Sequence, residues 1–166
     1  MILLLSVGVF LAWAAMVVVG DCRYRRIPNS LVVTGLICAI ASVAAGHNPF
    51  GITRVDAIIG AVVGFVGLFP FFAWRMMGAA DVKVFLVLGA WCGVRGLFWC
   101  WILASLVALI HVLGILYLTR TPVSALWQRS APAFSLGGRR GSPYAAFLVI
   151  PAAAWLIVQI VTGNMR

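Results

Sequence analysis

Three aspartates, Asp21, Asp56 and Asp81, are the only acidic residues in this chain of 166 residues. A carboxylate within a membrane segment costs at least about 2.5 to 3.5 kcal/mol at mid-helix, so such a residue usually serves a function. Two carboxyl groups that lie close together share one proton. The ionised group can then take a proton from water while the protonated group polarises a carbonyl. A meeting of Asp21 and Asp81 would allow aspartic-type hydrolysis, whereas either residue alone is more often a helix-boundary residue.

The composition places these carboxylates in a membrane protein. Hydrophobic residues make up 64% of the chain and charged residues 9%, against about 45 to 50% and 25% in soluble domains. A soluble fold of this size could not bury so much apolar surface. The lipid bilayer is therefore the expected partner. The net charge of +9 comes without a basic stripe interleaved with aromatics, so nucleic acid is not expected.

The apolar runs predict an all-α, polytopic membrane helical bundle in a single domain. A crossing needs about 20 mostly apolar residues, and the runs are continuous rather than alternating, which argues against strands. The first run has no basic residue before it and exceeds the length of a signal-peptide core, so it is expected to be retained. The six predicted transmembrane helices span residues 2–20, 30–46, 55–74, 80–93, 97–118 and 143–162.

The distribution of basic residues predicts the orientation. With the N-terminus outside, nine of the twelve basic residues fall inside, and Arg54, Arg95 and Arg166 fall outside. This arrangement places Asp21 and Asp81 together on the cytoplasmic side and Asp56 on the other side. The nine inside residues are Arg23, Arg25, Arg26, Arg75, Lys83, Arg120, Arg129, Arg139 and Arg140.

Local patterns predict two packing features. Pro28 suits the entry to the second helix, where Asn29 or Ser30 could cap the free amides. In the third helix Gly60 and Gly64 form a GxxxG pair, with Gly67 one turn beyond, that would admit a neighbouring backbone; glycine is also simply common in membrane helices. The only long polar connection is expected at 119–142.

The sequence offers few residues in the patterns that metal sites, cofactor sites or serine nucleophiles require. His47 is expected in an outside loop, and His111 lies in the fifth helix, which has no acidic partner for it, so a satisfied or bundle-facing histidine is the better interpretation. The four cysteines lack metal-ligand spacing and are interpreted as small apolar side chains. There is no GxSxG, HExxH or phosphate-binding glycine loop, so we expect no metal and no cofactor. Asp56 is placed to stabilise the positive end of the third helix.

Two motifs resemble the signature regions of type IV prepilin peptidases, particularly the short form of Flp-type (Tad) pilus systems. They are "DCRYRRIPNSL" at 21–31 and "MGAADVKVFLVLGAW" at 77–91, and a third segment, "SPYAAFLVIPAAAW" at 142–155, is similar to the start of the family's last helix. These are GxGD membrane aspartyl proteases. The resemblance implies that Asp21 and Asp81 are the catalytic pair, with Gly78, Lys83, Pro28 and Asn29 as supporting motif residues.

The resemblance further implies cleavage of a basic prepilin leader at the cytoplasmic face of the bacterial inner membrane. Ala80 departs from the family pattern, in which a second glycine is usual. The longer relatives carry an insertion with N-methyltransferase activity after the first helix, whereas only residues 21–29 connect helices here, so cleavage without methylation is expected. Lys83 should point about 200° away from Asp81 on a regular helix, and a structural role is at least as well supported as a catalytic one.

Two alternatives use the same aspartates without peptidase chemistry. In a small transporter Asp21 and Asp81 would bind a proton or cation, although carboxylates near the bilayer midplane and discontinuous helices would be more typical. An inactive relative could act instead as a pilus-assembly scaffold, which the departure at Ala80 slightly favours.

Overall fold

The computed structural model describes residues 2–24, 26–75, 77–120 and 144–163, and within these ranges it is helical with no strand. The all-α prediction is therefore confirmed for this part of the chain. The elements are α1 (Ile2–Val19), a π-helical segment η1 (Gly20–Tyr24), α2 (Asn29–Ala44), α3 (Arg54–Ala73), α4 (Ala79–Arg120) and α6 (Tyr144–Val161).

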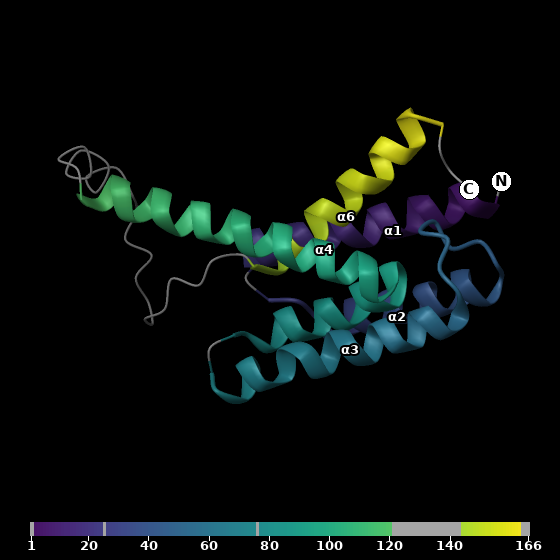
Figure 1. Ribbon diagram of the computed structural model, residues 1–166, viewed down its shortest axis with the longest axis horizontal. Coiled ribbons are helices and arrows are strands. Elements are labelled where there is room, and N and C mark those ends of the chain that lie inside the picture. Colours follow the sequence, from purple (N-terminus) through teal and green to yellow (C-terminus); the bar gives the residue numbers. More distant parts are fainter. Residues whose placement is uncertain (1, 25, 76, 121–143, 164–166) are drawn as a thin grey trace.

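The long element α4 contains a chain reversal at Gly93. Gly93 has φ 67° and ψ −179°, a backbone conformation that glycine adopts without steric cost. Figure 1 shows the first part of α4 running beside α3 and the second part returning in the opposite direction. The helices predicted at 80–93 and 97–118 are thus both present. The expected loop at 94–96 is instead helical, so the turn is concentrated in one residue.

The GxxxG pair brings α3 against the first part of α4. A Cβ atom added at Gly64 would lie 2.6 Å from the carbonyl oxygen of Phe85, and one added at Gly60 would overlap the carbonyl oxygen of Gly89. These two glycines therefore allow backbone contact, as predicted. An added Cβ at Gly67 would meet nothing within 4 Å, so this residue does not belong to the close contact.

Aromatic residues fill the core between α1, α2 and α4. Trp91 and Phe10 are fully buried, with ring centroids 5.2 Å apart. The indole N–H of Trp91 donates to the carbonyl of Gly35, and that of Trp13 donates to the carbonyl of Leu31. Each buried indole thereby satisfies its donor, and the two bonds fix α2 against α1 and α4.

The entry to α2 differs from its predicted capping. Pro28 occupies the N-cap position with φ −66° and ψ 145°, as suits a proline, but no side chain caps the helix. Asn29 already lies in the first helical position, from which its side-chain oxygen accepts a hydrogen bond from Lys83 instead. The prediction that Asn29 or Ser30 caps α2 was therefore wrong.

Four segments of the described chain are long and apolar enough to cross a membrane: Ile2–Tyr24, Arg54–Ala73, Ala79–Gly114 and Tyr144–Val161. The apolar helix Asn29–Ala44 is shorter. A membrane protein is supported on these grounds, while the finer expectation of six crossings remains a prediction. Most of the connection expected at 119–142, with Arg129, Arg139 and Arg140, lies outside the described residues; positions 119 and 120 belong to α4.

Candidate active site

Asp21 lies in the π-helical segment that extends α1. Its side chain is 9% exposed, and its Oδ2 accepts a 2.9 Å hydrogen bond from the backbone N–H of Ala146. The first helix thus continues through Tyr24 rather than ending at residue 20 as predicted. π-Helical turns are rare and often mark functional sites. Here the turn carries the one buried carboxylate of the described chain.

Asp81 lies in the first turn of α4. Its Oδ2 accepts a 3.2 Å hydrogen bond from the backbone N–H of Gly78, and the backbone N–H of Ala145 also bonds its carboxylate. The Gly78 contact has the geometry of one half of a capping box, in which the third helical residue bonds back to the cap amide. Asp81 is half-buried. Its side chain therefore caps the start of α4 and is also partly accessible.

The first turn of α6 brings the two aspartates together. Ala145 and Ala146 are consecutive, and one bonds Asp81 while the other bonds Asp21. The first amides of a helix have no partner within the helix and carry the positive end of its dipole, so this turn is suited to hold two carboxylates. The two carboxylates also lie close enough for electrostatic repulsion.

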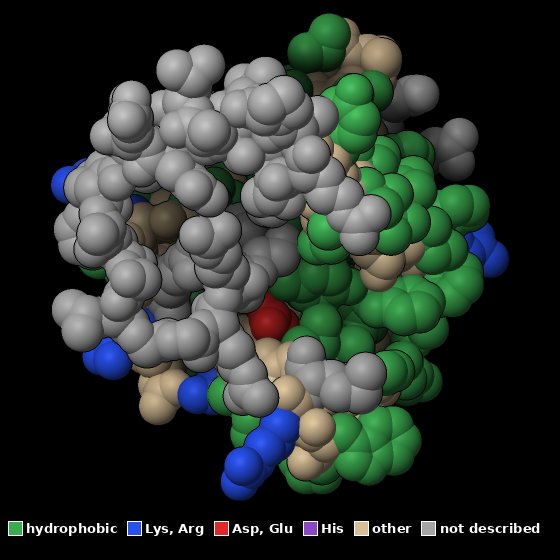
Figure 2. All heavy atoms as spheres, turned by 90° about the vertical axis from the view of Figure 1, so that its left-hand side faces the viewer, with side chains coloured by type: hydrophobic (Ala, Val, Ile, Leu, Met, Phe, Trp, Pro, Cys, Tyr) green, Lys and Arg blue, Asp and Glu red, His purple; other side chains and the backbone are tan. Residues whose placement is uncertain are grey.

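Tyr144, the first residue of α6, adds a polar side chain beside this pair. It is half-buried, it lies within electrostatic range of Asp81, and its hydroxyl is 3.0 Å from the hydroxyl of Ser105 on α4. Figure 2 views the end of the molecule that lies on the left of Figure 1, and it shows an acidic side chain near the centre, with Lys and Arg side chains toward the edges. The arrangement therefore combines two acid–base groups with basic side chains at the edge of the same face.

The remaining motif residues support this end of the bundle. The ammonium group of Lys83 donates a 2.7 Å hydrogen bond to Oδ1 of Asn29, which joins the start of α4 to the start of α2 directly after Pro28. The described hydrogen bond of Lys83 is thus to a neutral polar residue and not to either carboxylate. Two of the four supporting residues are therefore bonded to each other.

Gly78 and Ala80 flank the Asp81 carboxylate in different ways. An added Cβ at Gly78 would lie 3.2 Å from Oδ2 of Asp81, which is tight enough to move the carboxylate. Ala80 lies within α4, does not have positive φ, and packs its methyl against the core. The departure from the family pattern at this position therefore requires no strained backbone.

The other candidates have partners of their own outside the pair. Asp56 forms a capping box with Thr53 at the start of α3, where its Oδ2 accepts from the hydroxyl of Thr53 at 2.7 Å. His111 contacts the ring of Phe147, with ring centroids 5.7 Å apart. Cys92 and Cys100 lie in the hydrophobic core. Asp56 thus has the structural role expected for it.

Tyr144, Ala145, Ala146 and Ser105 were not identified as site residues from the sequence. The segment 142–155 had drawn attention through its resemblance, but the contribution of the two alanines is made by backbone amides, which leave no side-chain signal. The hydroxyl of Ser105 contacts that of Tyr144, which lies 39 positions later in the sequence. No local sequence pattern predicts such a long-range contact.

Comparisons with known proteins identify the family of this chain. The chain is 26% identical over 163 residues to a protein of Xanthomonas campestris pv. campestris named prepilin leader peptidase/N-methyltransferase, and the match covers 88% of this chain. It covers 48% of the relative, so the chain spans about half the length of that protein. No solved structure matches. The model of the type IV leader peptidase family matches residues 8–113, a range that includes both Asp21 and Asp81 and more than half of the chain, so the protein belongs to the type IV leader peptidase family.

Proposed function

We propose that this protein is an aspartic endopeptidase that removes the leader from Flp-like type IV prepilins, with Asp21 and Asp81 as the catalytic pair. The observation that supports this most directly is the convergence of the two carboxylates on the adjacent amides of Ala145 and Ala146. Residues from α4 and from the end of α1 are thereby held as one unit, as aspartic hydrolysis requires. The family membership supplies the peptidase class.

The proposed reaction uses one shared proton. The ionised carboxylate takes a proton from water, and the resulting hydroxide attacks the carbonyl carbon of the scissile peptide while the protonated carboxyl gives its proton to the carbonyl oxygen. The tetrahedral intermediate then collapses as the carbon–nitrogen bond breaks and the newly protonated carboxyl group gives its proton to the leaving amine. The other carboxylate takes back a proton from a hydroxyl group of the intermediate, which restores the shared proton. Because the two carboxyl groups titrate as a coupled pair, neither role is assigned to one aspartate.

We place this pair at the cytoplasmic face of the bacterial inner membrane, in a bundle of six crossings with its N-terminus outside. The excess of basic residues in the segments predicted to lie inside supports the orientation. A reporter fused after Gly137 is expected to report the cytoplasm. A periplasmic signal there would place both aspartates on the wrong side of the membrane for the proposed reaction.

We further propose cleavage without N-methylation. Only four residues, 25–28, separate η1 from α2, so this position holds none of the insertion that bifunctional relatives carry. Mass spectrometry of the mature pilin N-terminus tests this point. A methylated terminus in cells that carry no other methyltransferase would contradict it.

The central experiment co-expresses the protein with a candidate pilin and follows the mobility of the pilin band. Asp21→Asn and Asp81→Asn should each abolish processing while the protein remains in the membrane. Asp56→Asn is the matched control, because this carboxylate belongs to a capping box at the start of α3, and it should process normally. Continued processing by either Asp21→Asn or Asp81→Asn would overturn the assignment.

The same variants distinguish the competing function of a transporter. In that case the pilin would remain uncut even with the wild type, and Asp21→Asn and Asp81→Asn would alter ion flux in vesicles. A scaffold would leave both measurements unchanged while pilus assembly still depended on the protein.

A further inference from the structure

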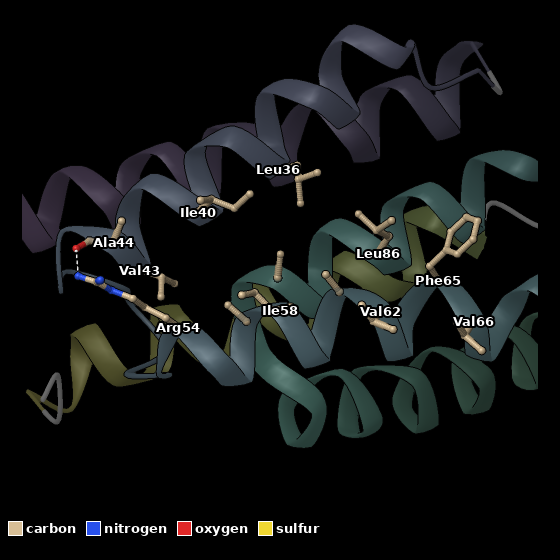
Figure 3. Close-up of a pocket in the computed structure, with 13 residues that line it drawn as sticks. Leu36, Ile40, Val43, Ala44, Arg54, Ile58, Val62, Phe65, Val66 and Leu86 are labelled. Atoms are coloured by element: carbon tan, nitrogen blue, oxygen red, sulfur yellow. Dashed lines mark hydrogen bonds between the residues drawn. The ribbon is translucent and has the colours of Figure 1, made fainter.

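A second feature of the molecule is an apolar groove far from most of the polar contacts described above. It has a volume of about 510 Å³ and lies between α2 and α3, with the first part of α4 forming its floor (Figure 3). Of the thirteen residues that line it, Arg54 is the only charged one and the others are apolar. The groove thus offers an apolar channel with one cation at its end.

One hydrogen bond between helices lies at one end of this groove, and another lies beyond its other end. At one end Nη2 of Arg54 donates to the carbonyl of Ala44 at 2.9 Å. At the other end the bond from Lys83 to Asn29 joins α4 to α2, one turn before the lining residue Leu86 and two turns before Leu36. α2 is therefore tied to its neighbours above and below the groove but stands apart from α3 between these points.

The side chains that line the groove face the hydrocarbon of the membrane. Ile58 is 66% exposed, Val62 56% and Ile40 55%, although each lies on a helix of an apolar bundle. Such surface in water would be an interaction patch, and in a bilayer it contacts lipid. The occupant therefore enters sideways from the membrane.

The size of the groove decides between a lipid chain and a protein helix. An α-helix with its side chains is about 10 Å wide, so a single turn of 5.4 Å occupies roughly 420 Å³. A groove of about 510 Å³ thus holds little more than one turn, although it extends along α3 from Ala57 to Val66. A thin, flexible hydrocarbon chain matches this long and narrow shape.

Arg54 supplies the charge complementarity that a phospholipid needs. Its side chain is exposed, and one of its five N–H donors is used by Ala44 in the described structure. A guanidinium binds phosphate through paired hydrogen bonds. The neighbouring carboxylate of Asp56 is bonded within its capping box and does not line the groove.

We infer that this groove binds one acyl chain of a phospholipid whose phosphate rests on Arg54, at the end of the bundle opposite to the two aspartates. The site goes beyond the proposed peptidase function and does not depend on it. It would make the spacing between α2 and α3 sensitive to the surrounding lipid.

The test uses the full-length protein in lipid nanodiscs that contain phosphatidylglycerol with a photoreactive diazirine on its acyl chain. After illumination, mass spectrometry locates the labelled residues. Labelling should concentrate on the groove faces of α2 and α3. Arg54→Gln should raise the half-saturating fraction of the probe lipid about tenfold, the effect of losing one charge-assisted hydrogen bond.

A matched pair of variants separates this site from ordinary lipid contact. Ile58 lines the groove, whereas the adjacent Ile59 is 47% exposed and does not. Ile58→Trp should reduce labelling of the α2 face several-fold, and Ile59→Trp should leave it unchanged. Equal effects of the two variants, even labelling of all lipid-facing helices, or displacement of the label by a synthetic apolar transmembrane peptide would each overturn the inference.

Discussion

The backbone N–H of Ala146 donates a 2.9 Å hydrogen bond to Oδ2 of Asp21, although the two residues are 125 positions apart. The bond fixes the orientation of a carboxylate in a π-helical segment through the free amide of another helix. It makes the start of α6 part of the proposed active site, with a contribution that no side chain provides.

Replacing Ala146 with proline should remove this bond selectively. Proline lacks the N–H and is tolerated in the first turn of a helix, where no internal hydrogen bond is lost. A hydrogen bond to a charged group contributes about 1.5 to 3 kcal/mol, so pilin processing should slow about 10- to 100-fold. Processing is measured as the rate of pilin band conversion in membranes.

Ala146→Val is the control for this prediction, because valine has a similar volume and keeps the amide. Ala146 is 1% exposed, so both variants strain the packing, and only the proline variant loses the donor. Equal rates for the two variants would show that packing, rather than the amide, controls the reaction.

Gly78→Ala should displace the Asp81 carboxylate. The new Cβ would lie 3.2 Å from Oδ2 of Asp81, so the carboxylate must move by a few tenths of an ångström. A full ångström of displacement can cost on the order of 100-fold in rate, so this smaller shift should cost less. Processing should therefore fall several-fold while the thermal unfolding of the protein in detergent changes little.

Ala80→Gly provides the converse comparison, because it restores the second glycine of the family pattern. Ala80 lies within α4 and needs no special backbone conformation, so this variant should keep its activity and lose about 1 kcal/mol of helix stability. A large gain in activity would instead show that Ala80 restrains the site.

The carboxylates could be predicted from sequence because a charge in an apolar chain is conspicuous. The count of basic residues also predicts that Asp21 and Asp81 lie on one side of the membrane and Asp56 on the other. The partners of the pair could not be predicted in this way. The donors from Ala145 and Ala146 depend on where α6 begins and how it packs, and neither property is written in the local residue types.

The helices show the same division. The apolar runs predict every α-helix that the structure describes, because the length of an apolar run reflects the length of helix that it forms. The π-helical turn at Gly20–Tyr24 was missed, since the insertion of one residue into a helix leaves no compositional mark. The helical reversal at Gly93 was also missed, because a single glycine can replace the loop that was expected at 94–96.

The pair of Lys83 and Asn29 should behave as a structural link rather than a catalytic one. The bond is exposed and 2.7 Å long, so Lys83→Ala and Asn29→Ala should each lower the free energy of unfolding by about 0.5 to 1 kcal/mol. Because both substitutions remove the same bond, the double variant should be no less stable than the less stable of the two single variants. A double-mutant cycle measures this coupling. If Lys83 instead acted on the carboxylates, Lys83→Ala would reduce processing strongly while Asn29→Ala would not.

Three glycines of α3 offer a graded test of the contact between α3 and α4. Gly64→Ala would place a Cβ 2.6 Å from the carbonyl oxygen of Phe85, and Gly60→Ala would overlap that of Gly89. Because the obstacle in each case is backbone, the helices must separate, and overpacking of this kind costs about 1 to 3 kcal/mol. Gly67→Ala meets nothing within 4 Å and should leave stability unchanged or raise it by up to about 1 kcal/mol, since alanine favours the helix. Thermal unfolding in detergent measures the stability of all three variants.

If Gly67→Ala destabilised the protein as much as Gly64→Ala, the glycines would act through backbone flexibility, and close packing of α3 on α4 would not be their role.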